Sequence, residues 1–423
     1  RLVGATTSNA TVSPGDGAYT PLMIFDGSLT LGSSSVLRFD LAATSRGPGL
    51  PSSSPGTIPR RLYGYDAIDC TGTVTLNGNL KATLSTATAN GLRFTPASTD
   101  SFTLIKSPAP IIGSFKNVSN GQRVATTDGG GSFVVSYGPT TAVDPNAVVL
   151  SQFQANTGPA TLMNISTRGR VGSGERAMIG GFIVTGSEPK PIIVRAIGPS
   201  LAALGVAETL DDPIVALHDQ NGLTIARNDD WQQASDAREI EATGIPPRDA
   251  REAAITATLA PGAYTAVVEG KNGRAGTALV EGYDLDAGSA SQLANISTRG
   301  YVETGDNALI GGVIVGGGTG STDVLVRAMG PSLAQAGVTG AMPDPSFALY
   351  AQSATGRQTI GSSDNWKENR AVVEATGLAP KDDRESALPI SLQPGAYTAV
   401  VTPSTTAGST PPGVGLVEFY RLK

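Results

Sequence analysis

Residues 164–169 read Asn-Ile-Ser-Thr-Arg-Gly, and the same six residues return at positions 295–300. Longer motifs recur in the same order: 194–202 at 326–334 with one substitution, 241–244 at 374–377, and 261–268 at 394–401. The offset grows from 131 (Asn164 to Asn295) to 137 (Glu281 to Glu418), as small insertions in loops between fixed elements would produce. A period near 130 exceeds the roughly 20–50 residues of solenoid repeats. We therefore expect two copies of one domain, each with its own core.

Length and composition predict three domains of all-β class. The chain has 423 residues, and domains usually run to about 100–200 residues. Its 53 Gly and 28 Pro are well above the average of roughly 12% for the two together, and they favour short strands joined by turns. The expected divisions are an N-terminal extension (1–24), a solenoid-like domain (25–155), and β-sandwich repeats at 156–288 and 289–423.

The region before the repeats reads as short strands. In residues 67–84, apolar side chains share one parity while Thr and Lys mostly take the other; these apolar residues are Ile68, Cys70, Val74, Leu76 and Leu80. Period-2 alternation indicates strands with one buried face. Rungs of about 20 residues are typical of a parallel β-solenoid; a β-sandwich is the alternative. The Pro- and Ser-rich residues 49–60 are expected to form a loop leaving the solenoid.

Some of these segments carry a resemblance. Residues 66–78 resemble the rung found near the end of bacterial autotransporter-type passenger domains. Residues 101–105, 113–115, 133–138 and 147–150 resemble the closing segments of the same domains. The resemblance implies a right-handed β-helix end, an extracellular location and an adhesive or scaffolding role. It does not imply self-translocation, because no membrane barrel follows.

The tandem copies resemble a repeat of large secreted surface proteins of environmental Gram-negative bacteria, with signatures NISTRG, VRAxGPSLA and PGAYTA over residues 160–423. Six or more short strands in each copy predict an antiparallel β-sandwich of the immunoglobulin-like or jelly-roll kind. One short helix is expected near 236–242 and one near 369–375, ending at Gly244 and Gly377 as left-handed C′ residues.

Acidic residues that recur in both copies form the first candidate site. Asn-Asp-Asp-Trp at 228–231 is matched by Ser-Asp-Asn-Trp at 363–366, with another Asp upstream in each copy. Clustered side-chain oxygens suit Ca²⁺, which binds six to eight oxygens. Alternatively, these residues make Asx turns and cap the following helix, and the Trp anchors the core. The calcium candidates are Asp212, Asp229, Asp230, Asp344 and Asp364.

Charged residues inside apolar strands form the second candidate. Arg195 and Glu281 lie in such strands of the first copy, and the second copy keeps them as Arg327 and Glu418. Glu281 has the parity of its apolar neighbours, and a buried carboxylate needs a partner. We expect the structural ion pairs Arg195–Glu281 and Arg327–Glu418; solvent-facing positions on an edge strand are the alternative.

Gly198-Pro199-Ser200 and its copy at 330–332 form the third candidate. A nucleophile elbow requires Gly-x-Ser-x-Gly and a His, but the final Gly and a His common to both copies are missing. We expect Ser200 to cap a helical turn instead. The Gly-Gly pairs at 180–181 and 311–312 lack the Lys-Ser/Thr of a phosphate loop and are expected to be strand bends.

Several function classes are disfavoured by composition. The chain has one His, His218, which the second copy replaces by Tyr350, and one Cys, Cys70, so neither shared triad chemistry nor a disulfide is expected. A net charge of −6 argues against nucleic acid binding. The most apolar stretch, 308–315, is too short for a transmembrane helix. Position 1 is Arg, which predicts a processed or partial chain whose export signal has been cleaved.

Together these features predict a non-enzymatic extracellular bacterial structural protein: a subunit of a surface fibre, filament or sheath, or an adhesin stalk. Its expected partners are neighbouring copies that form a homo-polymer, with residues 1–20 as a strand donated to a neighbour, and surface polysaccharide. The alternative is a carbohydrate-binding tandem module of a secreted polysaccharide-acting protein. A lyase or hydrolase on the solenoid is less favoured, because residues 60–150 hold no dense acidic set. No cofactor other than calcium is expected. Glycosylation stays open at the sequons of Asn9, Asn117, Asn164 and Asn295.

Overall fold

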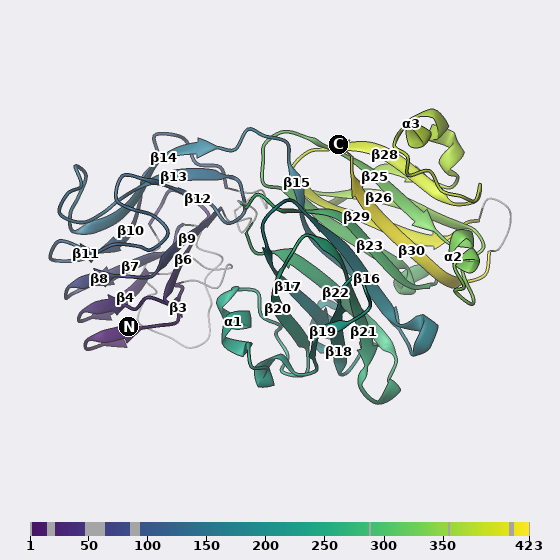
Figure 1. The fold of residues 1–423 in the computed structure, drawn as a ribbon, viewed down its shortest axis with the longest axis horizontal. Coiled ribbons are helices and arrows are strands. Elements are labelled where there is room, and N and C mark those ends of the chain that lie inside the picture. The colour runs from purple at the N-terminus through teal and green to yellow at the C-terminus, as the bar shows by residue number, and fades with distance from the viewer. Residues whose placement is uncertain are drawn as a thin grey trace. The chain divides into compact units, whose positions relative to one another are not determined.

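The structure is a computed structural model that describes residues 2–14, 22–46, 64–84, 94–286, 289–353, 356–405 and 410–422. It divides into two compact units, Arg1–Thr157 and Gly158–Lys423. Strands dominate both units, so the all-β class is confirmed (Figure 1). The loop expected at 49–60 lies outside the described residues.

The first unit is a parallel β-solenoid. Three rungs stack: β1 (Leu2–Val3), β2 (Thr6–Ser8) and β3 (Thr11–Val12); β4 (Leu22–Asp26), β5 (Leu29–Leu31) and β6 (Val36–Leu41); β7 (Ala67–Cys70), β8 (Val74–Leu76) and β9 (Asn79–Leu84). Each strand pairs in parallel with the corresponding strand of the next rung, giving three sheets. The residues whose parity predicted an inward face, Ile68 to Leu80, are buried.

Antiparallel strands close the far end of this solenoid. The strand β10 (Phe102–Lys106) pairs in parallel with β7 on one side and antiparallel with β14 (Ala147–Ala155) on the other. The sheet continues through β13 (Gly131–Ser136) to β12 (Arg123–Ala125), while the two-residue β11 (Ile112–Gly113) pairs with β8. Phe102 contacts Tyr65 and Phe133 edge-to-face, so an aromatic cluster fills the core at this end.

The expectation of a free N-terminal extension at 1–24 is wrong. Its described residues 2–14 form the first rung and residues 22–24 begin β4, and the strands of the first rung pair within the chain, for example Leu2 with Phe25 and Thr7 with Thr30. The physical reason is proximity: the edges of β4 to β6 lie a short connection away, so closing the loop costs little entropy. These strands therefore are not available for donation to a neighbour unless the rung opens.

The second unit contains both repeats, with equivalent strands in the same order. Repeat 1 comprises β15 (Thr161–Val171), β16 (Met178–Thr185), β17 (Lys190–Ile197), β18 (Pro213–His218), β19 (Thr224–Asn228), α1 (Ala237–Ala242), β20 (Ala253–Leu259), β21 (Gly262–Gly270) and β22 (Gly276–Asp284). Repeat 2 comprises β23 (Gln292–Val302), β24 (Leu309–Gly316), β25 (Thr322–Met329), α2 (Pro331–Gln335), β26 (Pro345–Ser353), β27 (Gly356–Ser363), α3 (Arg370–Ala375), β28 (Ser386–Leu392), β29 (Gly395–Pro403) and β30 (Gly413–Arg421). The short helices expected after the Asp-Trp motifs are present as α1 and α3, and both Gly244 and Gly377 have positive φ.

The two repeats exchange strand edges. The first strand of repeat 1, β15, pairs with β22 of its own repeat and with β24 of repeat 2. Reciprocally, β23 pairs with its own β30 and with β16 of repeat 1 (Figure 1). The described strands consequently form one connected 16-stranded sheet, and one apolar cluster contains residues of both repeats. The expectation that each copy has its own core is wrong, because each repeat completes its sheet with a strand of the other.

The Asn-Ile-Ser-Thr-Arg-Gly motif lies at this seam. Thr167 and its copy Thr298 meet where β15 and β23 run parallel, and the Thr167 hydroxyl donates to the Thr298 hydroxyl at 2.7 Å. Asn164 Oδ1 accepts the Ile314 N–H of repeat 2 at 2.7 Å, next to a register shift between β15 and β24. A Cβ at Gly169 would lie 2.9 Å from Leu309 Cδ1, so glycine permits the close packing of the two repeats. The repeated motif is therefore the contact between the copies.

Two of the four N-glycosylation sequons, those of Asn164 and Asn295, lie in the strands where the two repeats meet. Asn164 and Asn295 are only 3% and 5% exposed, inside the sheet. Asn117 is exposed, but its carboxamide bonds both the N–H and the C=O of Leu80. A glycan on Asn164 or Asn295 would require unfolding of the seam, whereas Asn9 is exposed on the first rung.

Candidate functional site

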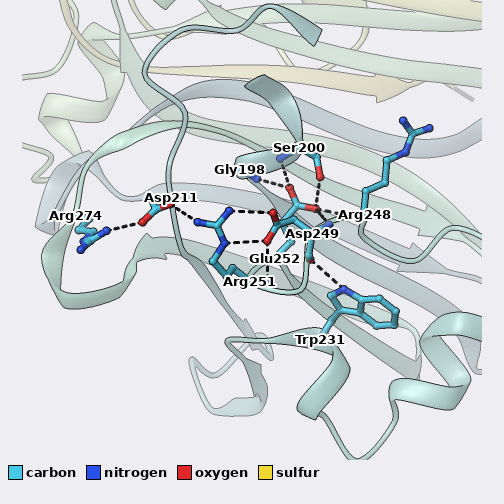
Figure 2. A network of polar contacts seen from close by, with 9 residues as sticks. All are labelled: Gly198, Ser200, Asp211, Trp231, Arg248, Asp249, Arg251, Glu252 and Arg274. Atoms are coloured by element: carbon cyan, nitrogen blue, oxygen red, sulfur yellow. Dashed lines mark hydrogen bonds and ion pairs between the residues drawn. The ribbon is translucent and has the colours of Figure 1, made fainter. Parts of the chain in front are cut away.

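A buried carboxylate organises the Gly-Pro-Ser turn of repeat 1 (Figure 2). Glu252, at 0% exposure, accepts the N–H groups of Gly198 and Ser200 on Oε1 at 3.1 and 2.9 Å. Its Oε2 accepts the Ser200 hydroxyl at 2.8 Å and two further N–H groups, of Arg248 and Asp249, at 3.2 Å. The expectation that Ser200 caps a helical turn is wrong, because its hydroxyl is bound to this carboxylate and the turn η2 (Pro199–Leu204) has no side-chain cap.

A series of ion-paired side chains, alternately acidic and basic, connects the loop of Glu252 to the protein surface. Arg251 bonds Asp249 through Nε and Nη2, both at 3.0 Å, and Asp211 through Nη1 at 2.5 Å. Arg274 bonds the other oxygen of Asp211 (Figure 2). The Arg251 hydrogen bond holds the pKa of Asp249 below its usual range. The Asp249 carbonyl accepts the indole N–H of Trp231, the buried residue that begins η3 (Trp231–Gln233). The network thus ties the Trp to the Gly-Pro-Ser turn.

Repeat 2 reproduces this network. Glu385, also 0% exposed, accepts the N–H groups of Gly330 and Ser332 at 3.0 and 2.8 Å and the Ser332 hydroxyl at 2.6 Å. The Asp382 carbonyl accepts the Trp366 indole N–H at 3.1 Å. Sequence reasoning missed the Asp-x-Arg-Glu motif at 249–252 and 382–385, although its recurrence at the offset of 133 found for the Pro-Gly-Ala-Tyr turn could have revealed it.

The two predicted ion pairs are present. Arg195 and Glu281 are direct cross-strand neighbours on β17 and β22, with Nη2 2.5 Å from Oε2 and side chains 14% and 8% exposed. The Tyr283 hydroxyl donates to the other Glu281 oxygen at 2.8 Å, and the Arg195 guanidinium lies 5.2 Å from the Tyr283 ring centroid. Burial first, and then the Glu281 charge, raise the pKa of Tyr283.

The equivalent residues of repeat 2 form the same arrangement. Arg327 lies 2.5 Å from Glu418, the Tyr420 hydroxyl donates to Glu418 at 3.0 Å, and the guanidinium lies 4.8 Å from the Tyr420 ring centroid. A Tyr two residues after the Glu was part of the same strand pattern but was not predicted to join the pair. In each repeat both oxygens of the Glu carboxylate are bonded by donors of the chain itself, as expected of a structural role, although Arg195 Nε has no partner among the described residues.

The calcium candidates of repeat 1 lie together, with a lysine among them. Carboxylate oxygens of Asp212, Asp229 and Asp230 all lie within 4.8 Å of one another. Lys271 Nζ is 2.9 Å from Asp229, 3.4 Å from Asp212 and 3.9 Å from Asp230. An ammonium group therefore already lies among these three carboxylates, and a divalent ion bound here would have to displace it. Sequence reasoning missed Lys271, which begins the short turn η4 (Lys271–Gly273).

In repeat 2 the acidic corner lacks that lysine. Ser404 donates its N–H to the Asp344 carbonyl at 2.8 Å, as Lys271 does to the Asp212 carbonyl at 2.9 Å, so Ser404 takes the position of Lys271. Burial first, and then the charge of Asp364, raise the pKa of Asp344. Repeat 1 sets Lys271 against three carboxylates, whereas repeat 2 has Asn365 in place of Asp230 and no lysine, so the two corners carry the same formal charge.

The raised pKa of Asp344 gives a pH-dependent prediction. A carboxylate whose pKa is raised on folding binds its proton more tightly in the folded state, so it destabilises the fold above that pKa and ceases to do so as the pH falls through it. We expect Asp344→Asn to raise the melting temperature at pH 7 and the gain to shrink at and below about pH 4, near the ordinary Asp pKa. Thermal unfolding followed by circular dichroism at both pH values tests this; a loss at pH 7, or an equal gain at both, would contradict it.

The single His and Cys lie apart from these networks. His218 ends β18, where its Nδ1 lies 3.2 Å from the Thr224 hydroxyl and 3.4 Å from the Gly222 carbonyl. Cys70 is buried in the solenoid, and burial raises the pKa of its thiol to about 12, so it stays protonated at neutral pH. Among the described residues, no helix is long and apolar enough to cross a bilayer.

Comparisons with known proteins give no family. No protein-family model and no curated protein matches the chain. Among solved structures, PNGF-II aligns at 10% identity and a TM-score of 0.17, covering 73% of this chain and 63% of its own. The enzymatically active domain of the bacteriophage CBA120 tailspike protein 4 aligns at 14% identity and a TM-score of 0.11, covering 68% of this chain and 38% of its own. The chain therefore spans less than two thirds of either structure, and at these TM-scores neither similarity supports an argument about function.

Proposed function

We propose that this chain is a non-enzymatic, extracellular structural protein of a bacterial surface, which associates with neighbouring copies through the first described rung of its solenoid into a fibre, filament or sheath. The observation that carries the proposal is the first rung. Within the described residues, β1, β2 and β3 are the terminal strands of their three sheets, each paired on one side only. Parallel edges of this kind are templates for another strand.

The composition of this rung supports the proposal. Residues 2–12 contain no charged side chain and no Pro, the devices by which proteins usually block exposed edges. Leu2 is 48% exposed on β1. The Thr6 N–H bonds the Ser28 carbonyl of the second rung, and successive residues of a parallel strand bond to opposite sides, so the Thr7 N–H points to the open edge. The three strands of the rung therefore offer edge N–H groups and carry no charged side chain of their own, although Arg1 precedes β1 and Pro14 follows β3 in the sequence.

The repeats support a structural rather than a catalytic role. The buried carboxylates that both copies share, Glu252 with Glu385 and Glu281 with Glu418, are bonded to donors of the chain itself. A catalytic carboxylate must keep a free oxygen for substrate. The interlocked strands of the repeats further suit a rigid projecting body.

A carbohydrate-binding tandem module is the less favoured function. Sugars bind proteins on exposed aromatic faces, and two half-exposed tyrosines of the repeats are already covered: Arg176 lies 4.3 Å from the Tyr301 ring centroid, and Arg357 lies 4.3 Å from that of Tyr350. Neither ring offers a free platform on that face.

The test is sedimentation of the full chain and of two edge variants. We expect the full chain to associate with rising concentration, into a closed dimer if two first rungs meet around a two-fold axis or into filaments if the contact is head-to-tail. Thr7→Pro removes the outward N–H, and Thr7→Lys places a charge on the edge; both should weaken association about tenfold or more while circular dichroism stays unchanged. Thr265→Lys, a half-exposed strand position in repeat 1, is the control. A full chain that stays monomeric at high concentration would refute the proposal, as would edge variants that associate as well as the full chain.

A further inference from the structure

A lysine of repeat 1 lies fully inside the protein beside an aspartate. Lys190 begins β17 and its side chain is 0% exposed; its Nζ lies 2.7 Å from Oδ2 of Asp284, the last residue of β22, whose side chain is 3% exposed. Lys271 and Lys367 also pair with aspartates, but their side chains are 36% and 41% exposed. Taking two charges out of water is costly, so the buried pair is an expensive feature of repeat 1.

Repeat 2 folds without this pair. Thr322 takes the position of Lys190 and Arg421 that of Asp284, as the registers of β25 with β28 and with β30 show. The same strands therefore form in repeat 2 with a Thr and an Arg at these two positions. The buried pair is thus not a requirement of the fold.

The atoms around the pair are placed for a reaction between its two members. Asp284 Oδ1 accepts the N–H of Asp286 at 2.8 Å, which polarises the carboxyl group through the oxygen that does not face the lysine. Lys190 Nζ donates to the Asp286 carbonyl at 2.5 Å and to the Ser289 hydroxyl at 3.0 Å, and these contacts hold it against Oδ2. Burial raises the pKa of Asp284, although the charge of Lys190 opposes this. Because burial disfavours charge, proton transfer from the ammonium to the carboxylate costs less here than in water.

We propose that Lys190 and Asp284 react to form an intramolecular amide bond, an isopeptide cross-link between β17 and β22. Proton transfer within the pair gives an amine and a carboxylic acid, held in contact so that the Nζ lone pair attacks Asp284 Cγ. The Asp286 N–H stabilises the charge that develops on Oδ1. The Nζ–Cγ bond forms, the Cγ–Oδ2 bond breaks, and Oδ2 leaves as water with two protons that came from the ammonium. No oxidant, metal or further reactant is consumed.

The cross-link closes residues 190–284 into a covalent loop. A pull along the chain then passes from β17 to β22 through the amide bond, and the strands β18 to β21 between them carry no load. This mechanical role rests on the proposed function as a surface structural protein, whereas the bond itself does not. Detection of the bond by mass is separate from the association that sedimentation measures, so either can fail alone.

Mass spectrometry of the denatured full chain tests the bond. We expect the predominant species to be lighter than its sequence mass by one water molecule. A tryptic digest should contain peptides 177–195 and 275–299, both bounded by Arg residues, joined as one. Peptide 252–271, which ends at the exposed Lys271, is the control and should appear unlinked. An unchanged intact mass would overturn the proposal, and so would loss of water without the joined peptide, as succinimide formation at an Asp-Gly sequence gives.

Three variants assign the reaction to this pair. Lys190→Arg keeps the positive charge, but its guanidinium stays protonated and is no nucleophile, so the variant should have its full sequence mass. Asp284→Ala removes the carboxyl group and should also have its full mass. Lys271→Arg makes the first change in an exposed pair and should still lose one water. Loss of water that persists in Lys190→Arg, or disappears in Lys271→Arg, would contradict the assignment.

Discussion

Replacing Glu252 by alanine is expected to lower the free energy of unfolding by about 3 kcal/mol or more, because it leaves buried donors without an acceptor. The carboxylate accepts four N–H groups and the Ser200 hydroxyl, all from the segments that join β17 to η2 and precede β20. The alanine side chain also leaves a void at a position with 0% exposure. Urea denaturation followed by Trp fluorescence measures the effect, since Trp231 is bonded to the same loop.

The control for this prediction is Glu269→Ala. Glu269 is exposed on β21, so its removal should change stability by no more than about 0.5 kcal/mol. Glu252→Gln keeps the shape but turns one acceptor oxygen into a donor, and its loss should fall between the two. A Glu252→Ala protein as stable as the Glu269→Ala protein would show that the network does not hold the turn.

The second large effect is expected for Glu281→Ala, which should cost about 3–5 kcal/mol because it leaves the Arg195 charge buried without its partner. Glu418→Ala removes the equivalent residue of repeat 2 and should cost a similar amount. Since both pairs belong to one connected sheet, each variant should lower the same unfolding transition, that of the unit formed by the repeats. Differential scanning calorimetry of both variants measures the loss and the number of transitions.

A double-mutant cycle separates the ion pair from simple truncation. Arg195→Met together with Glu281→Ala removes both charges, and the coupling energy between the two should reach about 1 kcal/mol or more. Tyr283→Phe removes only one hydrogen bond to Glu281 and should cost about 1 kcal/mol. A coupling energy near zero would mean that the two charges do not stabilise each other.

Local sequence patterns predicted which face of a strand is buried and which charged side chains lie inside apolar strands. Period-2 alternation over residues 67–84 gave the buried face of the third rung, because inward and outward positions follow from strand geometry alone. Arg195 and Glu281 could be paired because each interrupts an apolar strand and each returns in the second copy. Charge inside an apolar strand demands a partner, and the repeat supplies few choices.

The exchange of strands between repeats could not be read from these patterns. The strands β16 and β24 share the run Ile-Gly-Gly at 179–181 and 310–312, so β15 meets an almost identical edge in either repeat. A strand's alternation fixes which face is buried, not which neighbour completes the sheet. The choice depends on close contacts at the seam, such as Leu309 against Gly169, that only the assembled core reveals.

At the polar sites too, residues close together in the sequence were predicted, and partners distant in the sequence were not. The aspartates of repeat 1 were grouped correctly, but Lys271, which lies in a distant turn with its ammonium 2.9 Å from Asp229, was missed. Glu252 was missed because its partners at Gly198 and Ser200 are more than 50 residues away in the chain. Acceptor and donor each look like an ordinary loop residue until the fold brings them together.

The most direct measurement of the interlocked repeats is cleavage between them. A protease site inserted after Gly288 divides the chain into 1–288 and 289–423 without changing any described strand. If β15 pairs with β24 and β23 with β16, the two cleaved fragments should remain one particle on size exclusion under native conditions, and the two repeats should unfold together, apart from any transition of the solenoid. Fragments that separate without denaturant, or repeats that melt independently of each other, would contradict the shared sheet.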